Sequence, residues 1–164
     1  MRNSKSLSAK PSCNQKKIKA IKAIALILIL AAVSFFGFLD AGYLTAKHYL
    51  KTPIVCSIFE GCEKVLTSPY AVIYNIPVAL LGMIFYLVIF LTSLFYLTFE
   101  KKSAVNLIFI LSAAAFLASL YFIYLQLFII KAICFYCLLS AASSAVLFVL
   151  SFLLFVKIRI NESS

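Results

Sequence analysis

Four long apolar runs, separated by short clusters of charged residues, limit what this chain can fold into more than any other feature of its sequence. They cover about residues 23–46, 75–98, 104–127 and 133–156, and each has the roughly 20 residues that cross a hydrocarbon layer about 30 Å thick. Lipid offers the backbone no hydrogen-bond partner, so each run is expected to be a helix. The sequence therefore predicts an all-α integral membrane protein, a four-transmembrane-helix bundle with an extracytoplasmic loop between helices 1 and 2.

The composition leaves little material for a separate soluble domain, because 65% of the 164 residues are hydrophobic and only 12% are charged. We expect a basic cytoplasmic tail over residues 1–22, one membrane domain over 23–157 and a short cytoplasmic tail over 158–164. The first run is longer than the apolar core of a signal peptide, and no small-residue cleavage site follows it. It is therefore expected to stay in the protein as a membrane anchor.

The basic residues gather on one side of this predicted arrangement. The net charge is +10, but seven of the fifteen Lys and Arg residues precede the first run, which favours a topology-setting tail over contact with nucleic acid. Eleven basic residues fall on the side of the termini and four on the other side. The positive-inside rule then predicts a multi-pass protein of the cell inner or plasma membrane, with both termini cytoplasmic and the 47–74 loop outside.

This topology sorts the five cysteines into two groups. Cys56, Cys62, Cys134 and Cys137 fall on the outer side, and Cys13 falls on the inner side. Disulfides persist in oxidising compartments and are rare in the cytosol, so the outer set suits redox chemistry. Cys13 is expected to be an ordinary thiol.

Cys134 and Cys137 are three residues apart at the expected start of the fourth helix, where positions i and i+3 share a face. The amide groups and dipole of a helix N-terminus favour an anion, which lowers the pKa of the Cys134 thiol. Burial at the lipid boundary raises the same pKa. The balance of these two effects depends on the structure.

Cys56 and Cys62 enclose five residues that include Gly61, whose backbone freedom suits a tight loop. Thiol–disulfide exchange between a water-borne partner and an embedded pair needs such a mobile carrier. The alternatives are two static disulfides or a four-thiolate zinc site. A bridge between near neighbours on a helix removes little unfolded-chain entropy, and the zinc site would need tetrahedral closure at a lipid boundary, so we expect exchange and no metal site.

Several short motifs accompany these cysteines. Between Tyr43 and about Ser140 the chain carries the Cys56 and Cys62 pair, Ser68, Pro69-Tyr70-Ala71, Ile76-Pro77-Val78, Gly82 and Cys134-x-x-Cys137. This combination resembles the vitamin K epoxide reductase family in its bacterial form. The resemblance implies a four-helix bundle around a membrane quinone, ubiquinone or menaquinone. It also implies that Cys137 reduces the quinone, that Cys134 is its partner, and that Cys62 and Cys56 form the shuttle.

The resemblance further implies an enzyme, an oxidoreductase that generates disulfides in the periplasm by reoxidising a thioredoxin-fold partner and passing electrons to the quinone. Some bacterial relatives continue into a thioredoxin domain, and this chain ends at Ser164, so a separate partner protein is expected. Vertebrate-type enzymes have Thr-Tyr-Ala after the second cysteine where this chain has Leu138-Leu139-Ser140-Ala141, which disfavours epoxide reduction. Two alternatives stay open: a quinone or quinone-epoxide reductase acting for its reduced product, and a non-catalytic scaffold or metal-binding protein.

The resemblance also supplies candidates for the quinone pocket. Ser68 matches a hydroxyl near the reaction centre of the family, although a Ser before a helix is as often an N-cap. Ile76 and Pro77 are expected one turn inside the second span. Asn75 stands where many bacterial members have glycine, and Asn tolerates unusual backbone angles.

Asp40 is an ionisable residue in the outer third of the first span. Such residues are functional candidates by default, and proton handling is the role to expect. The alternative is an interfacial position, in which the carboxylate meets water, Lys47 or His48.

Overall fold

Four long helices form the protein, and the computed structural model describes residues 13–50, 61–73, 76–99 and 101–162. The helices are α1 (Cys13–Leu50), α3 (Val78–Phe99), α4 (Lys102–Tyr124) and α5 (Phe135–Glu162), with η2 (Leu125–Ile130) continuing α4 as a turn of π-helix. The segments of these helices that are long and apolar enough to cross a membrane are Ala23–Leu50, Val78–Phe99, Ser103–Ile130 and Phe135–Ile160. The predicted all-α fold with four transmembrane helices is confirmed.

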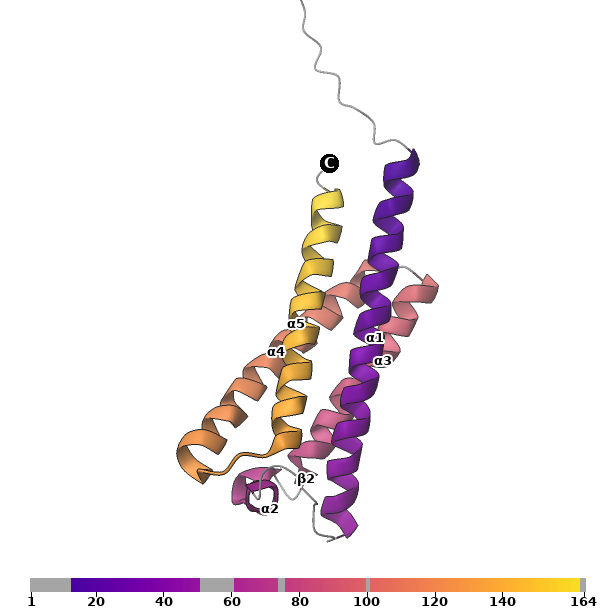
Figure 1. Cartoon of the computed structure of the whole chain (residues 1–164). Coiled ribbons are helices and arrows are strands. Elements are labelled where there is room, and N and C mark those ends of the chain that lie inside the picture. The colour runs from indigo at the N-terminus through magenta and orange to yellow at the C-terminus, as the bar shows by residue number, and fades with distance from the viewer. Residues whose placement is uncertain (1–12, 51–60, 74–75, 100, 163–164) are drawn as a thin grey trace, which may run out of the picture.

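The helices pack in an order that sets the interior of the bundle. α1 packs chiefly against α3 and α5, and α4 packs chiefly against α5 (Figure 1). The buried core between them is aliphatic and contains Ile27, Leu30, Ile89, Ile108, Leu147 and Leu154. Lipid provides no hydrophobic force between helices, so short polar contacts add to this packing. Hydroxyl pairs join α4 to α5 at Ser112 and Ser151, 2.6 Å apart, and at Ser119 and Ser144, 2.8 Å apart.

One aromatic side chain ties three helices together. Tyr86 of α3 is almost fully buried and lies against the backbone of Gly37 in α1, where an added Cβ would overlap its ring. Its hydroxyl donates a hydrogen bond to the carbonyl of Ser140 in α5 at 2.9 Å and lies 3.0 Å from the Ser140 hydroxyl. Gly37 therefore allows an aromatic ring at a place where α1 and α3 approach closely.

A small cap covers the end of the bundle that is opposite the start of α1 and the end of α5 (Figure 1). It consists of α2 (Gly61–Leu66), the 3₁₀ turn η1 (Pro69–Ala71), and two short antiparallel strands. These are β1 (Val72–Ile73) and β2 (Ile76–Pro77), with Val72 paired to Pro77 and Ile73 to Ile76. Except for β2, the cap lies within the 47–74 segment that the sequence predicts outside the membrane.

The second transmembrane helix starts later than the predicted residue 75. Ile76 and Pro77 belong to β2, and α3 begins at Val78. A proline restricts the residue before it to extended conformations, so helical geometry starts only after Pro77. The expectation that Ile76 and Pro77 lie inside this helix is therefore wrong.

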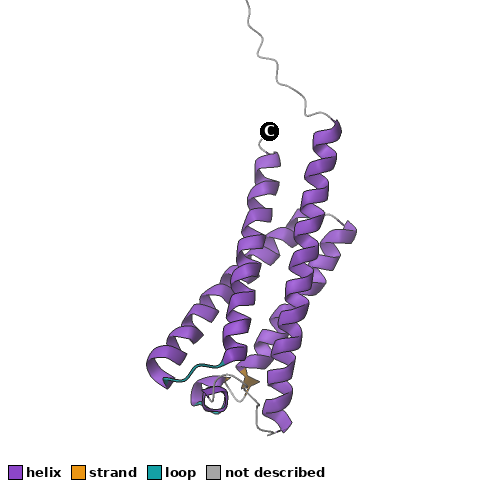
Figure 2. Ribbon diagram, in the orientation of Figure 1, coloured by secondary structure: helices purple, strands orange, loops and turns teal. Residues whose placement is uncertain are grey.

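The connection from α4 to α5 is short and sharply bent (Figure 2). Lys131 has a left-handed conformation, with φ 52° and ψ 40°, and its N–H donates to the carbonyl of Gln126. The N–H of Ala132 donates to the same carbonyl at 3.2 Å. α5 then begins at Phe135, so Cys134 stands immediately before the helix.

Candidate redox site and its cavity

Cys62 of the cap and Cys134 of the α4–α5 connection lie in one buried cluster together with Val65. Their side chains are 1% and 0% exposed, and Cys137, Tyr136 and neighbouring apolar residues pack around them. Cys62 is disulfide-bonded. Cys56 lies outside the described residues, so its pairing with Cys62 stays a prediction.

Gly61 explains how the cap comes so close to the connection. A Cβ at this position would be 2.7 Å from the carbonyl oxygen of Ile133 and 2.9 Å from its nitrogen. Among the described residues no glycine has a positive φ, so Gly61 is not needed here for the unusual loop conformation that the sequence suggested. It is needed because the backbones of the two segments touch, one residue away from Cys62 and from Cys134.

Cys134 and Cys137 are both free thiols in the structure. The N–H of Cys137 donates to the sulfur of Cys134 at 3.4 Å, which places that sulfur over the N-terminus of α5. The pKa of the Cys134 thiol is lowered, chiefly because the Cys137 thiol donates a hydrogen bond to it. Burial acts in the opposite direction, and the N–H groups of Cys137 and Tyr136 add to the lowering. The balance left open by the sequence thus favours the Cys134 thiolate.

Gln126 is a functional candidate that sequence reasoning missed. Its side chain is 4% exposed, and its Oε1 accepts a hydrogen bond from the N–H of Cys134 at 3.0 Å. Its backbone carbonyl accepts hydrogen bonds from the N–H groups of Lys131 and Ala132. Gln126 therefore fixes the backbone of the connection that leads to Cys134. The available signal was an amide side chain between Leu125 and Leu127 in an apolar run, because buried polar groups need partners.

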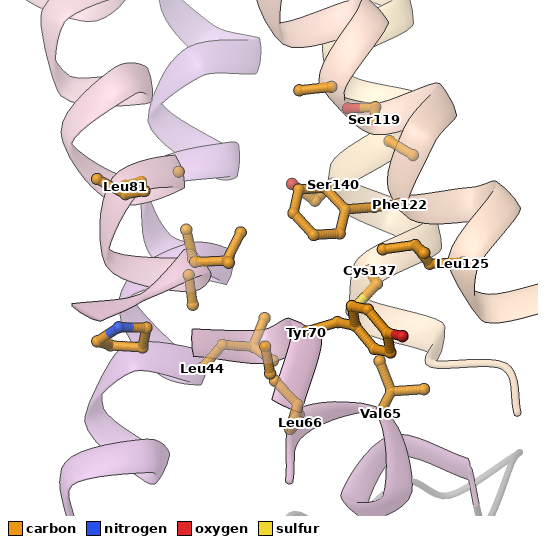
Figure 3. A pocket seen from close by; sticks show the side chains of 18 of the residues that line it. Leu44, Val65, Leu66, Tyr70, Leu81, Ser119, Phe122, Leu125, Cys137 and Ser140 are labelled. Carbon is orange, nitrogen blue, oxygen red and sulfur yellow. The ribbon is translucent and has the colours of Figure 1, made fainter. Parts of the chain in front are cut away.

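A cavity of about 480 Å³ opens between the helices beneath the cap. In Figure 3, Cys137, Ser140, Phe122 and Ser119 lie on one side of it, and Leu81 lies on the side of α3. The walls are mainly aliphatic and aromatic, with a few polar groups. This is the usual character of a pocket for an apolar small molecule.

Two of the three residues predicted for the quinone pocket line the cavity, and the third does not. Ser68 and Pro77 line the cavity, whereas Ile76 is 41% exposed and is not among the described lining residues. The burial of β2 differs in the same way, because Pro77 is buried and Ile76 is exposed. The hydroxyl of Ser68 donates to the carbonyl of Val65 at 2.6 Å and makes no cap bond to η1.

Asp40 also lines the cavity, on the side of α1. Its Oδ2 is buried and has no hydrogen-bond partner in the described part of the chain. The two residues expected near it are engaged elsewhere: Lys47 lies over the ring of Tyr43 at 5.8 Å, and His48 packs edge-on against Tyr49.

The described residues contain no group of three or more His, Cys, Asp and Glu side chains that could hold a metal ion. They do contain the buried cluster of Cys62 and Cys134, and Cys137 both packs against this cluster and lines the apolar cavity. Such an arrangement can exchange disulfides at one end and transfer two electrons to an apolar acceptor at the other.

Comparison with models of known protein families gives a match over most of the chain. The model of a protein family described as the vitamin K epoxide reductase family matches residues 28–152, which include Cys62, Cys134, Cys137 and the helices around the cavity. No curated protein matches the chain.

Proposed function

The chain belongs to the vitamin K epoxide reductase family, and we propose that it is a quinone-dependent thiol oxidase that generates disulfides outside the cytoplasm. The family implies quinone-linked thiol redox chemistry in a multi-pass membrane protein. The observation that carries the more specific proposal is the buried cluster of Cys62 and Cys134, with Cys137 both against that cluster and on the cavity wall.

The proposed reaction starts at the cap. A reduced thioredoxin-fold protein attacks Cys56 and releases Cys62, and Cys62 then attacks Cys134, which frees Cys137. The second partner thiol then resolves the mixed disulfide at Cys56, and the released Cys56 resolves the mixed disulfide between Cys62 and Cys134. The partner is left oxidised, and the Cys134 and Cys137 pair is left reduced. The lowered pKa of the Cys134 thiol supports the last of these steps, because a stabilised Cys134 thiolate leaves more easily when Cys56 attacks Cys62.

The cavity supports a quinone as the final acceptor. Its volume of about 480 Å³ and its apolar walls suit a substituted quinone ring, and Cys137 lies in contact with that space. Ser68, Pro77 and Ser140 contribute wall groups close to the cap or to Cys137, so the acceptor would be held between them. Ubiquinone and menaquinone both fit this description. The resulting disulfide pair is then ready for the next exchange.

The reduction potentials of the partner and the quinone support the direction of electron transfer, and the distribution of Lys and Arg supports the side of the membrane. A periplasmic oxidant near about −120 mV can be regenerated only by a more oxidising acceptor, and each ~30 mV corresponds to about 1.4 kcal/mol for two electrons. A membrane quinone meets that requirement.

The excess of Lys and Arg near the termini supports cytoplasmic tails over 1–22 and 158–164, a membrane domain over 23–157, and a redox site that faces the extracytoplasmic space of the inner or plasma membrane.

The test is a reconstituted reaction with the purified protein in detergent. A reduced thioredoxin-fold dithiol protein and duroquinone are supplied, and partner thiols and hydroquinone are measured together. We expect one hydroquinone for each partner disulfide, and loss of this reaction in single Ala variants of Cys56, Cys62, Cys134 and Cys137. Wild-type protein that oxidises no partner thiols with duroquinone, or that consumes a quinone epoxide instead, would contradict the proposal.

A further inference from the structure

Asp40 is a half-buried acid on the wall of the same cavity as Cys137. Its Oδ2 has no hydrogen-bond partner in the described residues, although it is shielded from solvent. An ionised carboxylate oxygen that is shielded from water and has no partner is disfavoured, and the neutral acid is disfavoured far less. A carboxyl group in this setting is suited to carry a proton and to recover it after losing it.

The proposed reaction has a use for such a proton. Conversion of a quinone to a hydroquinone takes two electrons and two protons. The sulfur of Cys134 accepts hydrogen bonds from the N–H and the thiol of Cys137, which favours Cys134 as the thiolate and Cys137 as the thiol. In that state the pair brings both electrons but only one proton. The second proton must come from another group at the cavity.

The other titratable groups around Asp40 are less suited to this role. Electrostatic interactions connect Asp40 to Cys134, Cys137, Tyr136 and Tyr86. Of these, the hydroxyl of Tyr86 is already bonded to Ser140.

Two more titratable residues line the cavity, His48 on α1 and Tyr70 on η1. His48 is eight residues beyond Asp40, about 12 Å along the helix axis. The described α4 residues on the wall are Ala114, Ala115, Ala118, Ser119, Phe122 and Ile123, none of which titrates. Among the described residues that line the cavity, Asp40 is the only carboxylic acid, and it interacts electrostatically with both cysteines of the redox pair.

We propose that Asp40 is a catalytic acid that gives the second proton to the quinone oxygen; this inference rests on the proposed function. In the forward step the Cys134 thiolate bonds to the sulfur of Cys137, the S–H bond of Cys137 breaks, and its electron pair passes to the quinone. One proton comes from Cys137 and one from Asp40, so the products are the disulfide, the hydroquinone and the Asp40 carboxylate.

The exchange with the cap returns the proton. Two reduced cap thiols and the Cys134–Cys137 disulfide give the cap disulfide, the Cys134 thiolate and the Cys137 thiol, with one proton left over. The Asp40 carboxylate takes that proton, so the cycle closes without net uptake from bulk water.

The test separates the two half-reactions in Asp40→Asn, Asp40→Glu and wild-type protein. Protein reduced in advance is mixed with duroquinone, and hydroquinone formation is followed over one turnover. We expect Asp40→Asn to slow this step about 100-fold or more, the usual contribution of a general acid, and Asp40→Glu to restore most of the rate. Exchange of oxidised protein with a reduced partner, measured without quinone by acid quenching and alkylation, should slow far less than the quinone step, because the proton released in the exchange can also pass to water.

The pH profile supplies a readout that a structural role would not change. The wild-type quinone step should rise as Cys134 loses its proton and fall as Asp40 loses its own, and Asp40→Asn should lack the falling limb. Ser34→Ala is the matched control, because Ser34 is a buried polar residue of α1 whose hydroxyl bonds to Ala31 away from the cavity.

The outcomes distinguish the two proposals. If wild-type protein does not reduce duroquinone, the proposed function fails. If it does, and Asp40→Asn matches its rate and pH profile, Asp40 is not the acid and the proposed function stands. Should Asp40→Asn not survive purification, the wild-type protein alone still tests the inference. If the rate of its quinone step does not fall at alkaline pH, the inference is overturned.

Discussion

The sulfur of Cys134 lies where three hydrogen-bond donors converge in an otherwise apolar cluster. Two are the N–H groups at the start of α5, and the third is the Cys137 thiol. In a buried site each donor is stronger than it would be in water, so together they outweigh the cost of burial and lower the pKa of Cys134. A thiolate at this position is the better leaving group when Cys56 attacks Cys62 and resolves the Cys62–Cys134 mixed disulfide.

Cys137→Ala removes the largest cause of this lowering and should raise the pKa of Cys134. A thiol alkylates only as the thiolate, so in the parent protein the rate should fall with decreasing pH through a midpoint below the usual ~8.5. In the variant the midpoint should move up and the rate at neutral pH should drop. Iodoacetamide labelling of Cys134 against pH, read by mass spectrometry, measures this, and an unchanged midpoint would rule out the role assigned to Cys137.

Gln126→Met should destabilise the connection that carries Cys134. The substitution keeps the length of the side chain but leaves the N–H of Cys134 buried without its acceptor, at a cost of about 1–3 kcal/mol. Thermal unfolding in detergent should show a lower midpoint. An unchanged midpoint would argue against this hydrogen bond.

At the scale of elements, α2 depends on the backbone contact that Gly61 allows. Gly61→Ala would place a Cβ within 3 Å of Ile133, whose carbonyl and nitrogen cannot give way as a flexible side chain would. We expect α2 to shift and carry Cys62 away from Cys134. A displacement near 1 Å slows a positioned reaction by up to about 100-fold.

The predicted result for Gly61→Ala is slower exchange between the cap and the Cys134–Cys137 pair, with an unchanged single-turnover quinone step. Gly42→Ala is the matched control, because a Cβ there would meet the sulfur of Met83 at an ordinary 3.6 Å. Wild-type exchange in Gly61→Ala, or equal losses in both variants, would show that this contact does not position Cys62.

The existence of the elements was easier to predict than their limits. Long apolar runs predict membrane helices because composition and length alone impose them. The same runs do not mark the start of α3 after Pro77 or the start of α5 at Phe135. The π-turn over Leu125–Ile130 contains neither Gly nor Pro, and its cause, the multiple hydrogen bonds of Gln126, exists only after the chain has folded.

At the scale of the whole molecule, the bundle brings the cap and the α4–α5 connection to the same end (Figure 1). The alternation of spans predicts this, and it is why four cysteines could be singled out from sequence. The cavity could not be located in that way, because aromatic residues occur along every transmembrane helix. Among the described Phe and Tyr residues, only Phe85, Phe122, Tyr70 and Tyr86 line it.

The orientation of the molecule is open to a direct labelling experiment. In a cysteine-free background, Lys64→Cys reports the cap and Ser103→Cys reports the opposite end, and both positions are exposed. We expect a membrane-impermeant maleimide to label Lys64→Cys in intact cells or spheroplasts and to label Ser103→Cys only after permeabilisation. The reverse pattern would place the redox site in the cytoplasm.

The central claim is that Cys62 and Cys134 lie close enough to exchange a disulfide. The most direct measurement is peptide mapping without reduction of a Cys56→Ala and Cys137→Ala double variant, in which each of these sulfurs has lost its own proposed partner. We predict a spontaneous Cys62–Cys134 disulfide in the membrane-embedded protein. Recovery of both cysteines as free thiols after mild oxidation would contradict the account.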